Sequence, residues 1–169
     1  LKPYVEGNTH TIFVAASLDE AFAKEFCFQL SPLAKTKYTT VIGMPTWDNI
    51  NDFSMPLYNG LEIMYTTPFY MNTSDSLVAY VQQYFKTNLY MRASDLIFRG
   101  FETMYHFANL LKEHGDSVIN NISEKKYYLF NHFDIEPVYF NKMGTEPDYY
   151  ENKKLYFIKK VDGNISVTN

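Results

Sequence analysis

The sequence is poor in cysteine, in long apolar runs and in clustered charge. Its single cysteine, Cys27, excludes a disulfide within the chain. No apolar run reaches the roughly 18 residues of a transmembrane helix, so we expect no membrane-spanning segment. No block of Lys and Arg exceeds two residues and the formal net charge is −4. The chain therefore lacks the electrostatic signature of a protein that binds nucleic acid or a membrane surface.

Residues arranged for catalysis are also scarce. His10, His106, His114 and His132 show no metal-ligand spacing among themselves, and the sequence contains no Gly-rich phosphate loop. Cys27 is flanked by phenylalanines, which is typical of a small buried apolar side chain. We therefore expect no enzyme activity, no metal and no cofactor.

Aromatic residues, by contrast, are abundant: they make up 18% of the chain, with 15 Tyr and 14 Phe. Tyrosine combines an apolar body with a polar tip, so it suits half-buried sheets and ligand clefts equally well. The aromatic content alone does not distinguish these two roles.

The first part of the chain alternates strand and helix patterns. Continuous apolar runs predict strands over Thr11–Ala16, Tyr38–Gly43 and Leu61–Thr66, the first of them buried on both faces. Ser17 and Glu20 have the spacing of a capping box, which predicts a helix that Pro32 ends. The expected apolar face of this helix consists of Leu18, Phe22, Phe26 and Leu30. A short helical turn over 48–53 separates the second and third strands, so we expect a parallel sheet with right-handed crossovers.

Two longer helices and antiparallel strands follow. We expect helices over about 75–87 and 94–113, the second with Gly100 packed closely against another backbone and Gly115 just beyond its end. The expected inward residues are Leu77, Val81, Tyr84 and Phe85 in the first helix, and Ile97, Phe101, Tyr105, Ala108 and Leu111 in the second. A strand is expected over 127–133, and Asp162-Gly163-Asn164 predicts a closing hairpin. The predicted fold class is α/β, a parallel sheet with flanking helices that closes with an antiparallel hairpin.

Four stretches resemble the C-terminal half of the type I periplasmic binding proteins, the leucine/isoleucine/valine-receptor-like group. They are TIFVAASLDEAF, YTTVIGMPTW, SDLIFRGFETMYHFANLL and the closing FDIEPVYFNKMGTEPDYYENKKLYFIKKVDG. Their order and spacing carry the resemblance more than any single motif does. The aromatic, Asn- and Lys-rich composition is similar to that of envelope proteins of this fold that accompany peptidoglycan-binding LysM modules.

This resemblance implies a non-catalytic receptor of the bacterial envelope, the substrate-binding component of an ABC transporter. Residues 1–66 would belong to the C-terminal lobe, 67–74 to a hinge crossing, 75–133 to helices that pack on the N-terminal lobe, and 134–169 to closing hairpins. The implied partners are a small polar solute (an amino acid, a peptide or a cell-wall fragment) and the missing N-terminal lobe. Without that lobe the chain should expose an apolar surface and associate as a homodimer.

Ligands of open α/β sheets bind outside the carboxyl ends of the strands, which selects three turns as the candidate ligand-binding site. Their residues are Ser17, Leu18, Asp19 and Glu20 in the first turn, Met44, Thr46 and Trp47 in the second, and Thr67 and Tyr70 in the third. Each has an alternative interpretation: Ser17 and Glu20 as helix caps, Trp47 as a core residue, Tyr70 as a packed aromatic. The chain would then be a structural or interaction module. An enzyme would instead require Asp19, Glu20 and Asp48 to cluster with a histidine.

Overall fold

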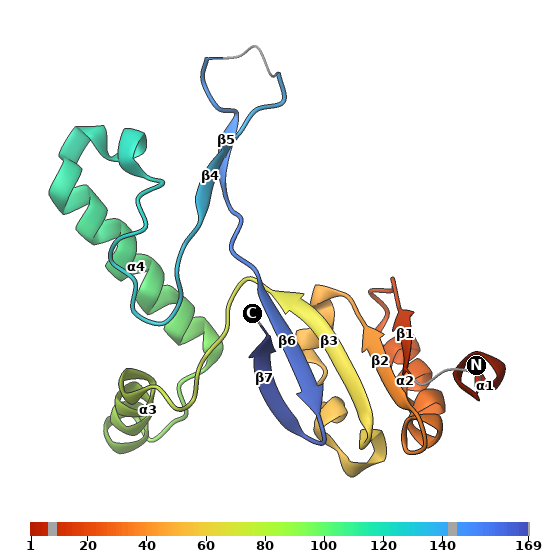
Figure 1. Ribbon diagram of the computed structural model, residues 1–169. Helices are drawn as coiled ribbons and strands as arrows, with labels where there is room; N and C mark the ends of the chain where they lie inside the picture. Colours follow the sequence, from red (N-terminus) through yellow and green to blue (C-terminus); the bar gives the residue numbers. More distant parts are fainter. Residues whose placement is uncertain (7–9, 142–144, 169) are drawn as a thin grey trace. The chain divides into compact units, whose positions relative to one another are not determined.

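The computed structural model describes residues 1–6, 10–141 and 145–168, so residues 142–144 of the closing motif lie outside it. The chain is a mixed α/β protein whose contacts divide it into two compact units (Figure 1). The first unit comprises Leu1–Thr67 and Leu155–Asn169, and the second comprises Pro68–Lys154. The division falls inside the segment 67–74 that the sequence suggests as a crossing.

The first unit is built on a five-stranded mixed sheet in the order β1-β2-β3-β6-β7. Its strands are β1 (His10–Val14), β2 (Tyr38–Ile42), β3 (Leu61–Thr67), β6 (Tyr156–Val161) and β7 (Asn164–Thr168). The three strands expected from apolar runs are present and parallel, while β6 and β7 form the expected antiparallel hairpin. Asp162 and Gly163 both have positive φ in its turn, as a two-residue hairpin of this type requires.

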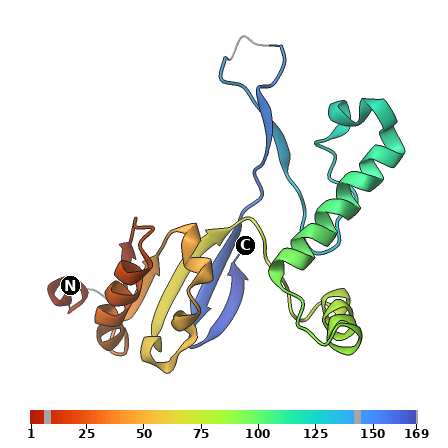
Figure 2. The ribbon, with the colours of Figure 1, turned by 180° about the vertical axis from the view of Figure 1, so that it is seen from behind.

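Helical segments cover one face of this sheet. The helix α2 (Glu20–Ala34) lies behind the sheet in Figure 1 and in front of it in Figure 2. Phe26 of α2 contacts Phe13 of β1 with ring centroids 5.9 Å apart. The 3₁₀ turns η1 (Pro45–Asn49), η2 (Asn51–Ser54) and η3 (Pro56–Tyr58) connect β2 to β3, where one helical turn was expected. A short helix, α1 (Lys2–Glu6), precedes β1.

Two expectations for α2 are wrong. Its N-cap is Asp19 rather than Ser17, because the Asp19 carboxylate accepts hydrogen bonds from the backbone N–H groups of Ala21 and Phe22. The helix also continues past Pro32 to Ala34. The buried face consists of Ala23, Cys27, Leu30, Ser31 and Ala34. Small side chains allow this face to pack closely on the sheet, while Leu18 and Phe22 remain exposed.

We call the opposite face of this sheet the open face, because several of its apolar side chains are exposed among the described residues. The strand β1 is therefore not buried on both faces, contrary to the prediction from its apolar run. The strand lies at the sheet edge, and Ile12 and Val14 are 57% and 73% exposed. The strand pairing places Ile42 and Phe157 on the same face, where both are also exposed. An apolar sequence pattern records that a strand can be buried on both sides, not that both covering layers are present.

The second unit consists of two helices and a hairpin. They are α3 (Ser76–Asn88), α4 (Asp95–His114), the 3₁₀ segment η4 (Gly115–Asn121), β4 (Ile135–Val138) and β5 (Tyr149–Asn152). Both helices agree with expectation to within one residue, and the positive φ of Gly115 ends α4. The strand expected over 127–133 is not formed, and Tyr127 has a φ of 55° that interrupts extended backbone. In the part of the chain that the structure describes, no helix has both the length and the apolar character needed to span a bilayer.

The buried face of α4 differs from the expected one. Phe98, Glu102, His106 and Leu110 are buried. Of the residues expected to point inward, Ile97 is partly buried, and Phe101, Tyr105, Ala108 and Leu111 are exposed. A Cβ added at Gly100 would have no neighbour within 4 Å, so the expected close backbone packing is absent there. The helix therefore presents its polar and aromatic stripe inward and much of its apolar stripe outward.

Packing between α3 and α4 forms the small core of the second unit. Val78 of α3 is buried with Phe69, Ala93 and Phe98. Val81 and Phe85, two of the residues expected to face inward from α3, pack partly buried against this cluster, while Tyr84 is exposed.

Candidate ligand-binding site

The tips of the three parallel strands lie at one edge of the first unit's sheet. The ladder continues past the strand ends, where Ala15 N–H donates to the Ile42 carbonyl and Gly43 N–H donates to the Met64 carbonyl, both at 2.8 Å. At that edge, Ser17 follows β1, Met44 follows β2 and Thr67 ends β3. Tyr70, the remaining candidate, belongs to the second unit. The structure thus brings together eight of the nine suggested residues, those from Ser17 to Thr67.

The first turn uses its backbone donors internally. Ser17 Oγ accepts from Asp19 N–H at 3.2 Å, and Asp19 Oδ1 accepts from Ala21 and Phe22 at 2.8 and 3.3 Å. Glu20 forms an ion pair with Lys24 at 2.6 Å. The donors that could hold a ligand carboxylate are therefore occupied by the Asp19 carboxylate.

The second turn is filled by Trp47, whose side chain is completely buried. Its indole Nε1 donates to the Ser17 carbonyl at 3.2 Å and thus ties the first two turns together. Its ring lies against Phe53, with centroids 5.4 Å apart, and directly over Gly43. This geometry agrees with the alternative interpretation of Trp47 as a core residue and leaves its faces unavailable for stacking on a ligand. Met44 is half-buried and Thr46 is exposed.

The acidic residues near these turns have separate partners. Asp19 caps α2, Glu20 pairs with Lys24, and Asp48 accepts from the Tyr65 hydroxyl at 3.0 Å. These contacts do not bring the three carboxylates together around a histidine, as the enzyme hypothesis requires.

A cavity of about 170 Å³ lies within the second unit. We call it the Arg99 pocket, and it is lined by residues that include Phe69, Arg99, Glu102, Thr103, Asn131 and His132. The Arg99 guanidinium lies over the Phe69 ring, 4.8 Å from its centroid. Arg99 Nε is buried and has no hydrogen-bond partner among the described residues.

Glu102 shapes the wall of this pocket. The side chain is almost completely buried and accepts hydrogen bonds from Phe130 N–H at 2.9 Å, from Asn131 N–H and from Asn131 Nδ2 at 3.1 Å. Asn131 Oδ1 in turn accepts from Tyr70 N–H at 2.9 Å. Glu102 thereby holds the 130–131 loop against α4, and Asn131 connects that loop to the segment containing Tyr70. A buried carboxylate with three donors orders a backbone that has no regular secondary structure of its own.

The Arg99 pocket is not predicted from the sequence. Arg99 and Glu102 lie in one of the stretches that resemble the type I binding proteins, but Asn131 is 29 residues after Glu102 and its loop lies in a segment predicted as a strand. The sequence signal that could have indicated this pocket is the spacing of Arg99 and Glu102, three positions apart on one helix. Their burial depends on contacts that local pattern does not encode.

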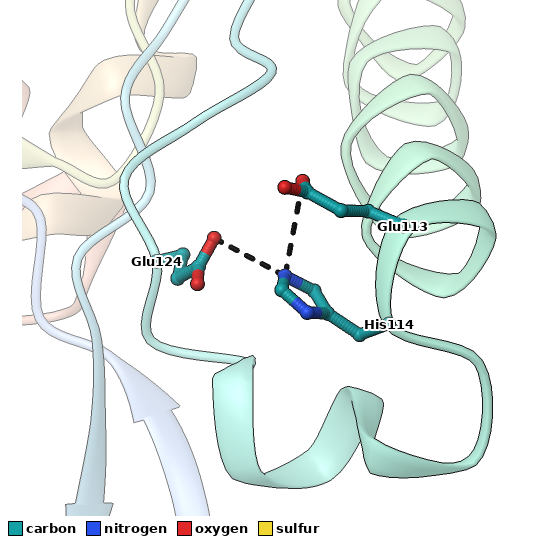
Figure 3. A group of neighbouring side chains, drawn as sticks. All are labelled: Glu113, His114 and Glu124. Atoms are coloured by element: carbon teal, nitrogen blue, oxygen red, sulfur yellow. Dashed lines mark hydrogen bonds and ion pairs between the residues drawn. The ribbon is translucent and has the colours of Figure 1, made fainter.

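Histidine, glutamate and lysine also gather at the end of α4. Glu113, His114 and Glu124 each offer one ligand atom, and these atoms lie within 4.8 Å of one another (Figure 3). The spacing of the histidines among themselves does not predict this group, because its other two members are glutamates.

Comparison of the chain with protein-family models, with curated proteins and with solved structures gives no match. The resemblance to type I binding proteins therefore rests on the sequence motifs alone.

Proposed function

We propose that the chain is a non-catalytic solute-binding module whose ligand occupies the Arg99 pocket. The observation that carries this proposal is the buried Arg99 Nε, which has no hydrogen-bond partner among the described residues. A buried donor without a partner is costly, because it has lost water and gained nothing in exchange. A ligand oxygen at this position would supply the missing acceptor.

The size and chemistry of the pocket select the ligand class. A water molecule occupies about 30 Å³ in the liquid, so a cavity of about 170 Å³ has room for about six water-sized groups. An amino acid or another small carboxylate fits this volume, whereas a peptide or a cell-wall fragment does not. Arginine binds carboxylates through its planar fork of donors, and Asn131 and Thr103 add neutral polar groups to the lining.

The wider role is part of the same proposal. The chain is the C-terminal half of a type I receptor of the bacterial envelope, and it serves an ABC transporter together with an N-terminal lobe. Support comes from the parallel β1-β2-β3 ladder with its tips at one edge, and from the division of the chain between Thr67 and Pro68. The candidate strand-tip residues would then face the missing lobe.

Ligand titration of two matched arginine variants tests the binding proposal. The wild-type chain is screened by thermal shift against small carboxylates (acetate, glycine, alanine and lactate), and hits are measured by calorimetry. We expect Arg99→Met to weaken binding by about tenfold or more. Arg92→Met removes the same charge from an exposed position and should leave the affinity unchanged.

Two results would contradict the proposal: no member of the panel raises the melting temperature, or both arginine variants weaken binding equally. Arg99→Lys guards against a folding artefact, because it retains the positive charge but loses the guanidinium fork. Its binding should be intermediate while its far-UV circular dichroism matches wild type.

A second function is favoured by one specific observation. Trp47 fills the space between the first two strand tips, while the open face of the sheet exposes Ile12, Val14, Ile42 and Phe157. These features suit an interaction module that pairs with a second copy of the chain, since a two-fold contact needs only one self-complementary surface. Sedimentation velocity should then show a dimer that Phe157→Lys dissociates; a monomer at all concentrations excludes it.

A further inference from the structure

The C-terminal end of α4 carries a cluster that neither the strand tips nor the Arg99 pocket includes. Glu113 and His114 belong to its last turn, and Glu124 returns to them after η4 (Figure 3). His114 Nε2 lies 3.3 Å from Glu124 Oε2 and 3.8 Å from Glu113 Oε2. We call these three residues the Glu113–His114–Glu124 cluster.

Local hydrogen bonds fix the return of the chain. Gly115, with a φ of 53°, ends the helix, and Ser117 Oγ donates to the His114 carbonyl at 2.7 Å. Asn121 Nδ2 donates to the Ser117 carbonyl at 2.9 Å within η4. The backbone that positions Glu124 opposite His114 is therefore held by its own contacts.

We propose that the Glu113–His114–Glu124 cluster binds a divalent transition-metal ion, with Zn²⁺ as the best match. Zinc takes imidazole nitrogen and carboxylate oxygen at about 2.0–2.2 Å in tetrahedral geometry, which places ligand atoms about 3.3–3.5 Å apart. The 3.3 Å separation between His114 and Glu124 already has this value, and the 3.8 Å separation to Glu113 is slightly longer. Small rotations of the glutamate side chains complete the set, and a water takes the fourth position.

One further feature favours a cation here. The carbonyl end of a helix carries partial negative charge, and the cluster lies at that end of α4.

Lys126 competes for the same place. Its Nζ lies 3.0 Å from Glu113 Oε1 and 2.9 Å from Glu124 Oε2, so the chain supplies a cation of its own between the carboxylates. Lysine has a long flexible stem and can swing into water when a metal arrives. The metal gains the His114 imidazole nitrogen as a ligand in addition to the two carboxylates that Lys126 contacts.

Zinc titration of the full chain tests this site, using competition with a chromophoric chelator and the d–d absorption of Co²⁺ as a second probe. We expect wild type to bind one Zn²⁺ and His114→Gln to bind it about tenfold or more weakly. Lys126→Met should bind about tenfold more tightly, because it removes the competing charge. His10→Gln removes an exposed histidine from the other unit and should not change the affinity.

The opposing outcomes are equally definite. If Lys126→Met does not strengthen binding, zinc does not replace Lys126 between the two carboxylates and the proposal is wrong. If His10→Gln weakens binding as much as His114→Gln does, zinc binds nonspecifically to surface histidines and the proposal is also wrong. Absence of zinc binding to the wild type leaves the cluster as a set of ion pairs and also overturns it. Metal-free circular dichroism of each variant separates loss of ligands from loss of fold.

Discussion

The close contact between Gly43 and Trp47 predicts that a side chain added at position 43 lowers the stability of the protein. A Cβ at position 43 would lie 2.2 Å from the Trp47 ring, which is buried and anchored to the Ser17 carbonyl. We expect Gly43→Ala to lower the free energy of unfolding by about 1–3 kcal/mol through overpacking, measured by urea titration. In a Trp47→Leu background the same change should have a much smaller effect, since the two sites are coupled.

Gly100 provides the matched control for that measurement. It lies inside α4, and an added Cβ there meets nothing within 4 Å. Gly100→Ala should therefore stabilise α4 by up to about 1 kcal/mol, because alanine has the higher helix propensity. Equal destabilisation by both substitutions would mean that the Gly43 contact is not responsible.

The thiol of Cys27 makes stability depend on pH. Burial raises the pKa of Cys27 from 9.0 to about 12, so its proton is bound more tightly in the folded state. The resulting stabilisation is complete below pH 9 and is lost as the pH rises from 9 towards 12. Between pH 8 and 10, the unfolding free energy of wild type should fall by about 1.4 kcal/mol more than that of Cys27→Ala. Parallel pH profiles of the two proteins would contradict this assignment.

At the scale of elements, the orientation of α4 is testable with two phenylalanines of the same helix. Phe98 is fully buried and contacts the Phe130 ring at 5.2 Å, whereas Phe101 is 53% exposed. Phe98→Ala should lower the unfolding free energy by about 3–5 kcal/mol. Phe101→Ala should change it by no more than about 0.5 kcal/mol. A large loss for Phe101→Ala in urea unfolding, followed by circular dichroism, would show that this outer face is covered.

The same helix shows what could be predicted from the sequence and what could not. Its bounds follow from local signals, since Ser94 precedes it and Gly115 can adopt the positive φ that ends it. Its buried face does not, because Glu102 is drawn inward by three donors on residues 130 and 131. The positions of β1, β2 and β3 could also be predicted locally, because each strand coincides with a continuous apolar run. The Arg99 pocket was not, since its walls are brought together only by tertiary contacts.

His106 illustrates the same limit within α4. Its ring is buried, contacts the Phe133 ring at 4.6 Å and uses Nδ1 to bond the Lys126 carbonyl at 2.8 Å. Every one of these partners lies at least 20 residues further along the chain. The predicted inward face of α4 does not include His106, because its burial depends on the irregular loop that packs there.

At the scale of the whole molecule, the two units should be separable. Thr67 and Tyr156 are paired at the ends of β3 and β6, so the chain leaves and re-enters the first unit at neighbouring positions. Replacing residues 68–155 by Asn-Gly would join these strands through a two-residue hairpin turn. All five strands of the sheet and its α2 cover remain in the shortened chain.

We expect this shortened chain to fold, because the sheet draws its pairing and its core from the first unit alone. Trp47 is the only tryptophan and is fully buried there, so its fluorescence reports that unit specifically. Its emission should stay blue-shifted and should change in one cooperative urea transition. Red-shifted emission in native buffer would mean that the second unit is needed to form the sheet. The units would then be one folding domain, and the proposal that they belong to different parts of a receptor would lose its structural support.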